Sequence, residues 1–144
     1  MLLLAGCGGS SQPAATTPPR PAGTPVIQLT SADVDTAGTL AKAATCDGAG
    51  RSPAVRFANV PAAAKELQLV VTDPDAPGGT FTHWDLPIDP AIRSIPAGAG
   101  EDSGWKAVCP PEGDPPHHYR FQLTAYGAGK KVLAIGVLEA TYGR

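Results

Sequence analysis

The side chains best suited to acid–base or anion-binding chemistry fall in a few short stretches of the chain, which contain all three of its histidines. These stretches read Asp73-Pro74-Asp75-Ala76-Pro77, His83-Trp84, Cys109-Pro110-Pro111 and His117-His118-Tyr119. Imidazole nitrogens and a phenolic hydroxyl can donate hydrogen bonds to an anion, whereas an ionised carboxylate only accepts them. Two roles therefore suit the aspartates: holding an imidazole in one tautomer, or meeting an ammonium group.

Each stretch also has a purely structural interpretation. An Asp-Pro-Asp sequence often forms only a turn, because Asp bonds to nearby backbone and Pro fixes φ. His83 shares a predicted strand face with Phe81, and His117 and Tyr119 share one with Phe121, so packing in the core explains them nearly as well. From the residues alone, both interpretations stay open.

The elements that position these groups are predicted to be short strands at residues 55–60, 67–72, 81–86 and 119–126, separated by Pro, Gly and Asp. Strict alternation places Phe81, His83 and Asp85 on one side of their strand and Trp84 on the other. Residues 130–138 fit either a helix or a terminal strand. Short strands joined by turns favour an all-β antiparallel sandwich.

Composition excludes some classes of protein. The 144 residues include 17 Gly and 16 Pro, are 42% hydrophobic and carry a net charge of -2, which is typical of a globular core and not of a basic nucleic-acid binder. No apolar stretch approaches the length of about 20 residues that a transmembrane helix needs.

The N-terminal residues Leu4-Ala5-Gly6-Cys7 resemble a bacterial lipobox, in which the cysteine is lipidated. Residues 1–25 are therefore predicted to be a truncated lipoprotein signal and a flexible tether, since they lack a periodic apolar face, and residues 26–144 to be one domain. The predicted location is the cell envelope, with Cys7 as the anchor facing outside the cytoplasm. Only six residues precede Cys7, fewer than a secretory signal needs, so a cytoplasmic location is the alternative.

Two further cysteines, Cys46 and Cys109, are predicted to form a disulfide if the protein is exported. In a cytosolic protein both would be reduced. Neither lies in the spacing of a structural zinc site.

Taken in order, these stretches resemble the phosphatidylethanolamine-binding protein family, in its bacterial Raf-kinase-inhibitor-like branch. The markers are the DPDAP stretch, the HW dipeptide that follows it, and the CPP stretch that leads into an aromatic strand. Upstream, residues 46–53 are similar to the CDG-N-SP segment of the family. The resemblance extends over residues 39–144.

This resemblance implies a Greek-key β-sandwich with a short C-terminal helix or strand, and a small pocket at one end that accepts a phosphate-like anion. The ligand-binding residues it implies are Asp73, Asp75, His83, Pro110, His117 and Tyr119. Backbone amides near Val108 and Cys109 are expected to complete the anion site. No metal or other cofactor is expected.

The sequence departs from the family at two positions that bear on the site. His118 stands where the family usually has an arginine, which removes a permanent cation. After Gly127 a linker and helix of the family are missing, and we expect this deletion to lie beside the pocket and to leave it open.

The favoured function is therefore a non-enzymatic binding module for phosphate or a phospholipid headgroup, in contact with the membrane through its lipid anchor only and with no nucleic acid. An inhibitor or interaction protein that acts on a kinase or protease is the alternative. A metal-assisted hydrolase is a third class, because carboxylates and histidines can gather a divalent ion, but the chain has no HExxH or GxSxG motif.

Overall fold

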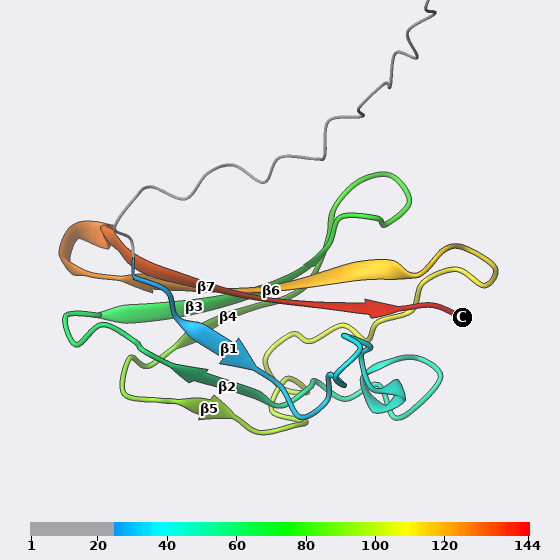
Figure 1. Cartoon of the computed structure of the whole chain (residues 1–144), viewed down its shortest axis with the longest axis horizontal. Helices are drawn as coiled ribbons and strands as arrows, with labels where there is room; N and C mark the ends of the chain where they lie inside the picture. The colour runs from blue at the N-terminus through cyan, green and yellow to red at the C-terminus, as the bar shows by residue number, and fades with distance from the viewer. Residues whose placement is uncertain (1–24) are drawn as a thin grey trace, which may run out of the picture.

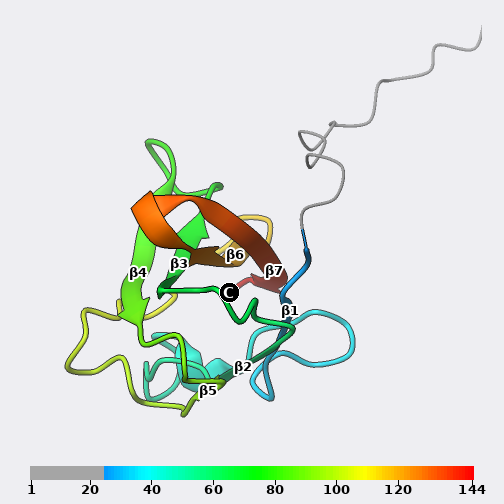
Figure 2. The same cartoon turned by 90° about the vertical axis from the view of Figure 1, so that its left-hand side faces the viewer.

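Two antiparallel sheets form the fold in the computed structural model, which describes residues 25–144. The smaller sheet has the order β1-β2-β5, with β1 at Gln28–Thr30, β2 at Val55–Ala58 and β5 at Ser94–Ile95. The larger sheet has the order β4-β3-β6-β7, with β4 at Phe81–Ile88, β3 at Glu66–Asp73, β6 at His117–Tyr126 and β7 at Val132–Tyr142. The sheets lie in two layers (Figures 1 and 2), which confirms the predicted all-β sandwich.

Helix is almost absent from residues 25–144. It is confined to two 3-10 turns, η1 at Lys42–Ala44 and η2 at Ala128–Lys130, and none of it is long and apolar enough to cross a membrane. The predicted lipid-attachment residue Cys7 and all of the predicted tether except Pro25 lie outside the described residues.

The core lies between the sheets and follows the alternation in the sequence. On β6 the buried residues are Tyr119, Phe121, Leu123 and Ala125, and on β3 they are Leu67, Leu69 and Val71. Leu29, Val55 and Phe57 face them from the smaller sheet. Because burial of one such aliphatic or aromatic side chain stabilises a fold by about 1.5–3 kcal/mol, these alternating positions hold the two layers together.

Strand β4 breaks the alternation that its sequence predicts. Val71 pairs with Trp84 but Thr72 pairs with Thr82, so His83 is an extra residue in a β-bulge. The bulge buries both His83 and Trp84, whereas Phe81 and Asp85 are exposed. Phe81 and His83 do share a face, because their ring centroids are 4.8 Å apart and both line one pocket, but Asp85 points to solvent and Trp84 is buried beside His83. The predicted alternation is therefore wrong for Trp84 and Asp85, because a single strand does not reveal an irregularity in its pairing.

The C-terminal segment is a strand, which resolves the two alternatives for residues 130–138. β7 pairs antiparallel with β6 along its whole length, from Val132 opposite Tyr126 to Tyr142 opposite His117. The hairpin places the C-terminus beside the beginning of β6, at the right-hand side of Figure 1.

A disulfide joins Cys46 to Cys109, as predicted, with 5.3 Å between the two Cα atoms. It links the loop after η1 to the loop before β6, and a parallel bridge between Thr45 and Val108 lies beside it. On the chain-entropy model, closing a 63-residue separation stabilises the fold by about 4 kcal/mol. The disulfide therefore fixes one of the loops that surround the candidate site.

Candidate functional site

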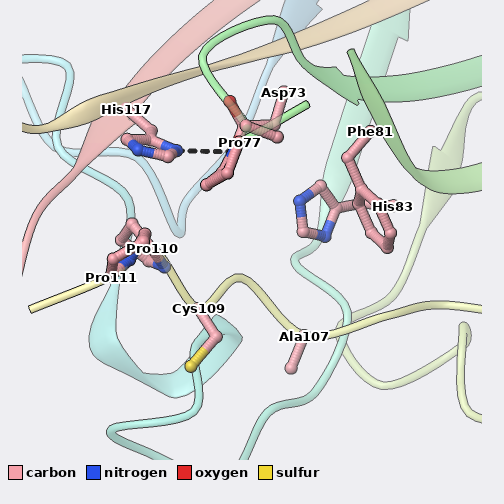
Figure 3. A pocket seen from close by; sticks show the side chains of 10 residues that line it. Asp73, Pro77, Phe81, His83, Ala107, Cys109, Pro110, Pro111 and His117 are labelled. Atoms are coloured by element: carbon pink, nitrogen blue, oxygen red, sulfur yellow. Dashed lines mark hydrogen bonds and ion pairs between the residues drawn. The ribbon is translucent and has the colours of Figure 1, made fainter. Parts of the chain in front are cut away.

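A pocket of about 400 Å³ opens at the end of the sandwich where β3 ends and β6 begins. Its lining comes from these two strands, from the loop and first residues of β4, and from the loop that carries the disulfide (Figure 3): Asp73, Ala76, Pro77, Phe81, His83, Ala107, Cys109, Pro110, Pro111 and His117. Four of the predicted ligand-binding residues are among them, namely Asp73, His83, Pro110 and His117.

Asp73 and His117 form a buried, oriented pair in one wall of the pocket. His117 Nδ1 lies 2.8 Å from Asp73 Oδ2, and the backbone N–H of Asp75 donates to Asp73 Oδ1, also at 2.8 Å. Each side chain is about one-twentieth exposed. Because a carboxylate accepts a hydrogen bond from Nδ1–H, this contact fixes the imidazole tautomer. The other ring nitrogen, Nε2, lies 3.9 Å from the carboxylate oxygen Oδ2 of Asp114.

His83 lies in the opposite wall, and its orienting partner is different. Its Nδ1–H donates to the backbone carbonyl of Lys106 at 2.8 Å. Burial lowers the pKa of His83, and the positive charge of Lys106 adds to this, although the bond to Lys106 and the negative charge of Asp73 oppose it. At neutral pH the ring is therefore uncharged, with Nε2 as an acceptor. Figure 3 shows that one ring nitrogen of His83 is directed toward the middle of the pocket.

Tyr119 was predicted to contact the ligand, but it lies behind the pocket lining. Its side chain is fully buried, its ring centroid is 5.5 Å from that of His83, and its hydroxyl has no hydrogen-bond partner among residues 25–144. Burial, with the negative charge of Asp73, raises the pKa of the Tyr119 hydroxyl, which stays protonated. The residue supports the His83 ring and does not line the pocket, because the β4 bulge places that ring over it.

Asp75 was also predicted to bind the ligand, but it faces a neighbouring pocket of about 330 Å³ that His117 shares. The remaining lining residues of this second pocket are Asp114, Pro115, Pro116 and His118. Asp75 Oδ2 accepts hydrogen bonds from the His118 ring at 2.7 Å and from the His118 backbone N–H at 2.8 Å. These bonds lower the pKa of Asp75.

One of the two backbone amides expected in the anion site, that of Val108, is already used in a hydrogen bond within the fold. The Val108 N–H donates to the Ala44 carbonyl at 3.2 Å, so Val108 is not part of an anion site, contrary to expectation. That bond belongs to the parallel bridge next to the disulfide, a long-range pairing that the sequence does not reveal.

The missing linker after Gly127 does not border the pocket. The residues 127–131 that join β6 to β7 lie at the other end of the sandwich, the whole length of β6 away from His117. In Figure 1 this turn is at the far left, whereas β6 begins at the right. The expectation that the deletion lies beside the pocket is therefore wrong.

Sequence reasoning missed several residues of the site. Phe81 is 42% exposed at the rim, and the Lys106 ammonium lies 5.1 Å from its ring centroid. Lys106 also supplies the carbonyl that holds His83. The available signal for Phe81 was its place two residues before His83 on the same predicted strand face, whereas a role for a backbone carbonyl leaves no trace in the sequence. Within residues 25–144, no three His, Cys, Asp or Glu side chains are grouped so that they could hold a metal ion.

The family is established by comparison with known proteins. A family model described as Phosphatidylethanolamine-binding protein matches residues 30–142. The chain is 36% identical to "Putative lipoprotein LppC" of Mycobacterium tuberculosis, over 85% of this chain and 73% of that protein. It is 32% identical to the UPF0098 protein YbcL of Escherichia coli, over 69% of this chain and 68% of that one.

Solved structures agree. The crystal structure of E. coli YbcL, described as a new member of the mammalian PEBP family, matches with a TM-score of 0.74 and 25% identity, over 82% of this chain and 98% of that one. A homologue from Chlamydia trachomatis matches with a TM-score of 0.71 and 29% identity, over 83% and 98%. The chain belongs to the phosphatidylethanolamine-binding protein family, among its bacterial members.

Proposed function

We propose that this protein is a non-enzymatic binding module for a small phosphate-bearing ligand, such as a phospholipid headgroup. One observation carries the proposal: a pocket of about 400 Å³ has two buried imidazoles in its walls, and each has its Nδ1 held by an acceptor. Pockets of a few hundred Å³ with a few well-placed polar groups are typical of small-ligand sites. The family name points to the same ligand class.

The orientation of the histidines determines which form of the ligand binds. A neutral His83 offers only an acceptor at Nε2, because its proton is on Nδ1. A phosphate oxygen can bond to that nitrogen only if it carries a proton or if the ring takes one up. We therefore propose that binding favours the protonated form of the site or of the ligand and strengthens as the pH falls.

The second pocket suits the cationic part of a zwitterionic headgroup. His117 borders both pockets, and Asp114 Oδ2 lies 3.9 Å from His117 Nε2. The Asp114 carboxylate is about half exposed. A phosphate in the first pocket would therefore leave an ammonium group a short distance from Asp114 and Asp75.

The test is titration of isotope-labelled protein with inorganic phosphate and with phosphoethanolamine, followed by NMR. We expect both ligands to shift the signals of the residues that line the pocket, and His83→Ala to weaken both about tenfold or more, since one bond to a charged group contributes about 1.5–3 kcal/mol. His118→Gln, outside this pocket, is the matched control and should leave phosphate binding unchanged. The absence of shifts at millimolar ligand would reject the proposal.

With this function we propose a location in the cell envelope through lipidation of Cys7. The lipobox-like residues support it, and so does similarity to a relative named as a lipoprotein. Intact-mass analysis of the membrane fraction should show a lipid adduct that Cys7→Ser removes. Unmodified protein in the soluble fraction would instead support the cytoplasmic alternative.

A further inference from the structure

The end of the sandwich opposite the pocket, called here the distal end, consists of the turns at residues 59–65, 89–93 and 127–131, the adjoining strand residues Glu66 and Val132, and Val26. These turns join β2 to β3, β4 to β5 and β6 to β7, and they lie together at the left of Figure 1. Ile27 donates its backbone N–H to the Ile135 carbonyl at 3.2 Å, which fixes the first described residues to β7 at this end. Residues 1–24, which include Cys7, are thus joined to the domain at the distal end.

Lysines are concentrated at the distal end. Lys65, Lys130 and Lys131 are all exposed, and the Lys65 N–H donates to the Tyr126 carbonyl at 2.7 Å, next to the turn that carries the other two. The Lys130 ammonium pairs with Glu66 and lies 5.7 Å from the centroid of the Tyr126 ring. The turn at residues 89–93 adds Arg93 and Asp89, both exposed. Four cations (Lys65, Arg93, Lys130 and Lys131) therefore stand against two carboxylates (Glu66 and Asp89), and a local excess of positive charge remains in a protein of net charge -2.

Exposed aliphatic side chains accompany these lysines. Among residues 25–144, four large hydrophobic side chains are exposed, and three of them are at the distal end: Val26 at 48%, Val132 at 45% and Ile92 at 42%. The fourth, Phe81, is at the pocket. Exposed aliphatic residues flanked by lysines are typical of surfaces that insert shallowly into the headgroup region of a bilayer.

The pocket end differs, because its cations Arg144, Lys106 and Lys42 are accompanied by at least as many carboxylates. Asp75 and Asp114 lie there around the second pocket, and Asp47 and Glu112 surround Arg144, with Arg144 Nε 3.0 Å from Asp47 Oδ1. An anionic lipid surface would therefore attract the distal end, which has an excess of cations, more strongly than the pocket end, where carboxylates offset the cations, and this difference orients the domain.

We propose that the distal end binds the surface of an anionic phospholipid bilayer and holds the pocket facing away from it. The ammonium groups of Lys65 and Lys131 meet lipid phosphates, and Val26 and Val132 enter the headgroup region. This inference does not depend on what the pocket binds. In this arrangement the lipid anchor and the distal end bind the same membrane together. The second contact matters because a single lipid chain gives only marginal binding by itself.

The test uses the full chain with Cys7→Ser, so that no lipid contributes. Co-sedimentation is measured with vesicles of phosphatidylcholine alone and with vesicles that contain about a third phosphatidylglycerol. We expect binding only to the anionic vesicles, and expect it to weaken at high salt. Replacing Lys65 and Lys131 by Gln should weaken it about fivefold each, and about 25-fold together. Lys130 is left in place because it packs on Tyr126.

The matched control replaces Lys42 and Arg51, two exposed cations on either side of the disulfide-bonded Cys46 and so away from the distal end, by Gln. It removes the same charge and should leave vesicle binding within about twofold of the parent, since only cations close to the lipid surface contribute. Equal losses in both double variants would overturn the proposed surface, and no binding to anionic vesicles at low salt would overturn the proposal altogether.

An environment-sensitive label reports the orientation directly. Attached at Ala128→Cys, in the distal turn, it should shift to the blue when anionic vesicles are added. Attached at Thr80→Cys, in the exposed loop beside the pocket, it should not. The reverse pattern would show that the pocket end faces the bilayer.

Discussion

The two histidine walls of the pocket are alike in burial but differ in what orients the ring. His117, the first residue of β6, gives its Nδ1–H to the carboxylate of Asp73, whereas His83, in the β4 bulge, gives its Nδ1–H to the carbonyl of Lys106. The ring of His117 is held by another buried side chain, whereas the ring of His83 is held by a backbone carbonyl and burial lowers its pKa. The Asp73 side of the pocket is thus built for rigidity, and the His83 side for sensitivity to protons.

Removal of the anion from the His117 wall should have the largest effect. Asp73→Ala leaves the Nδ1–H of a buried His117 and the N–H of Asp75 without their acceptor. We expect the free energy of unfolding to fall by about 3 kcal/mol, the scale for breaking a buried pair by deletion of one partner. Urea denaturation measures this. If stability changed by only a few tenths of a kcal/mol, the His117 wall would not be the rigid one.

His83 should make the free energy of unfolding depend on pH. Burial holds the pKa of folded His83 below the unfolded value of about 6.5. The unfolded chain then binds more protons as the pH falls, so this residue lowers the free energy of unfolding at acid pH and has no effect well above its unfolded pKa. The slope it adds is at most about 1.4 kcal/mol per pH unit.

Denaturation midpoints of the parent and of His83→Phe, measured at several pH values from about 8 to about 5, isolate this contribution. The variant should lose part of the acid destabilisation. Asp73→Ala should keep the contribution of His83 and enlarge it, because it removes a negative charge that opposes the lowering of the His83 pKa. An identical pH slope in parent and His83→Phe would show that His83 is not held neutral by its surroundings.

The exposed Asp75–His118 pair offers the smallest effect and a contrast to Asp73–His117. Its two side chains are 43% and 61% exposed, against 5% and 6% for the buried pair. We expect Asp75→Asn to cost less than about 1 kcal/mol in urea denaturation, since water and ions screen the interaction. Because the pKa of Asp75 is lower in the folded protein than in the unfolded chain, Asp75 stabilises the fold at neutral pH. This stabilisation is lost as the pH falls through the lowered pKa. If Asp75→Asn lowered the free energy of unfolding as much as Asp73→Ala does, the proposed difference between the exposed and the buried pair would be contradicted.

Much of the fold was predictable because it depends on periodicity. The alternation in residues 119–126 locates the central strand and its core face correctly, and the even pair of cysteines gives the disulfide. The terminal strand was left open between two alternatives, because Val132, Ile135 and Glu139 also fit a helical spacing. Only pairing with β6 settles it.

The site was less predictable, for reasons that concern pairing across the sheet. The bulge at His83 arises between β3 and β4 and changes which residues face inward. It also places Tyr119 behind a ring, not in the pocket wall. Asp75 accepts hydrogen bonds from His118, the residue at the position where the sequence resemblance implies an arginine. None of these contacts has a local signature, so the motifs indicate which groups gather but not which of them a ligand would touch.

The central claim is that a phosphate-bearing ligand binds between His83 and His117, and one measurement tests it most directly. Phosphoethanolamine is titrated calorimetrically at about pH 6 and about pH 8, in buffers of different ionisation enthalpy. We predict tighter binding at the lower pH, with net proton uptake that His83→Phe abolishes. No binding at either pH would contradict the claim, and equal affinities without proton uptake would contradict the role given to His83.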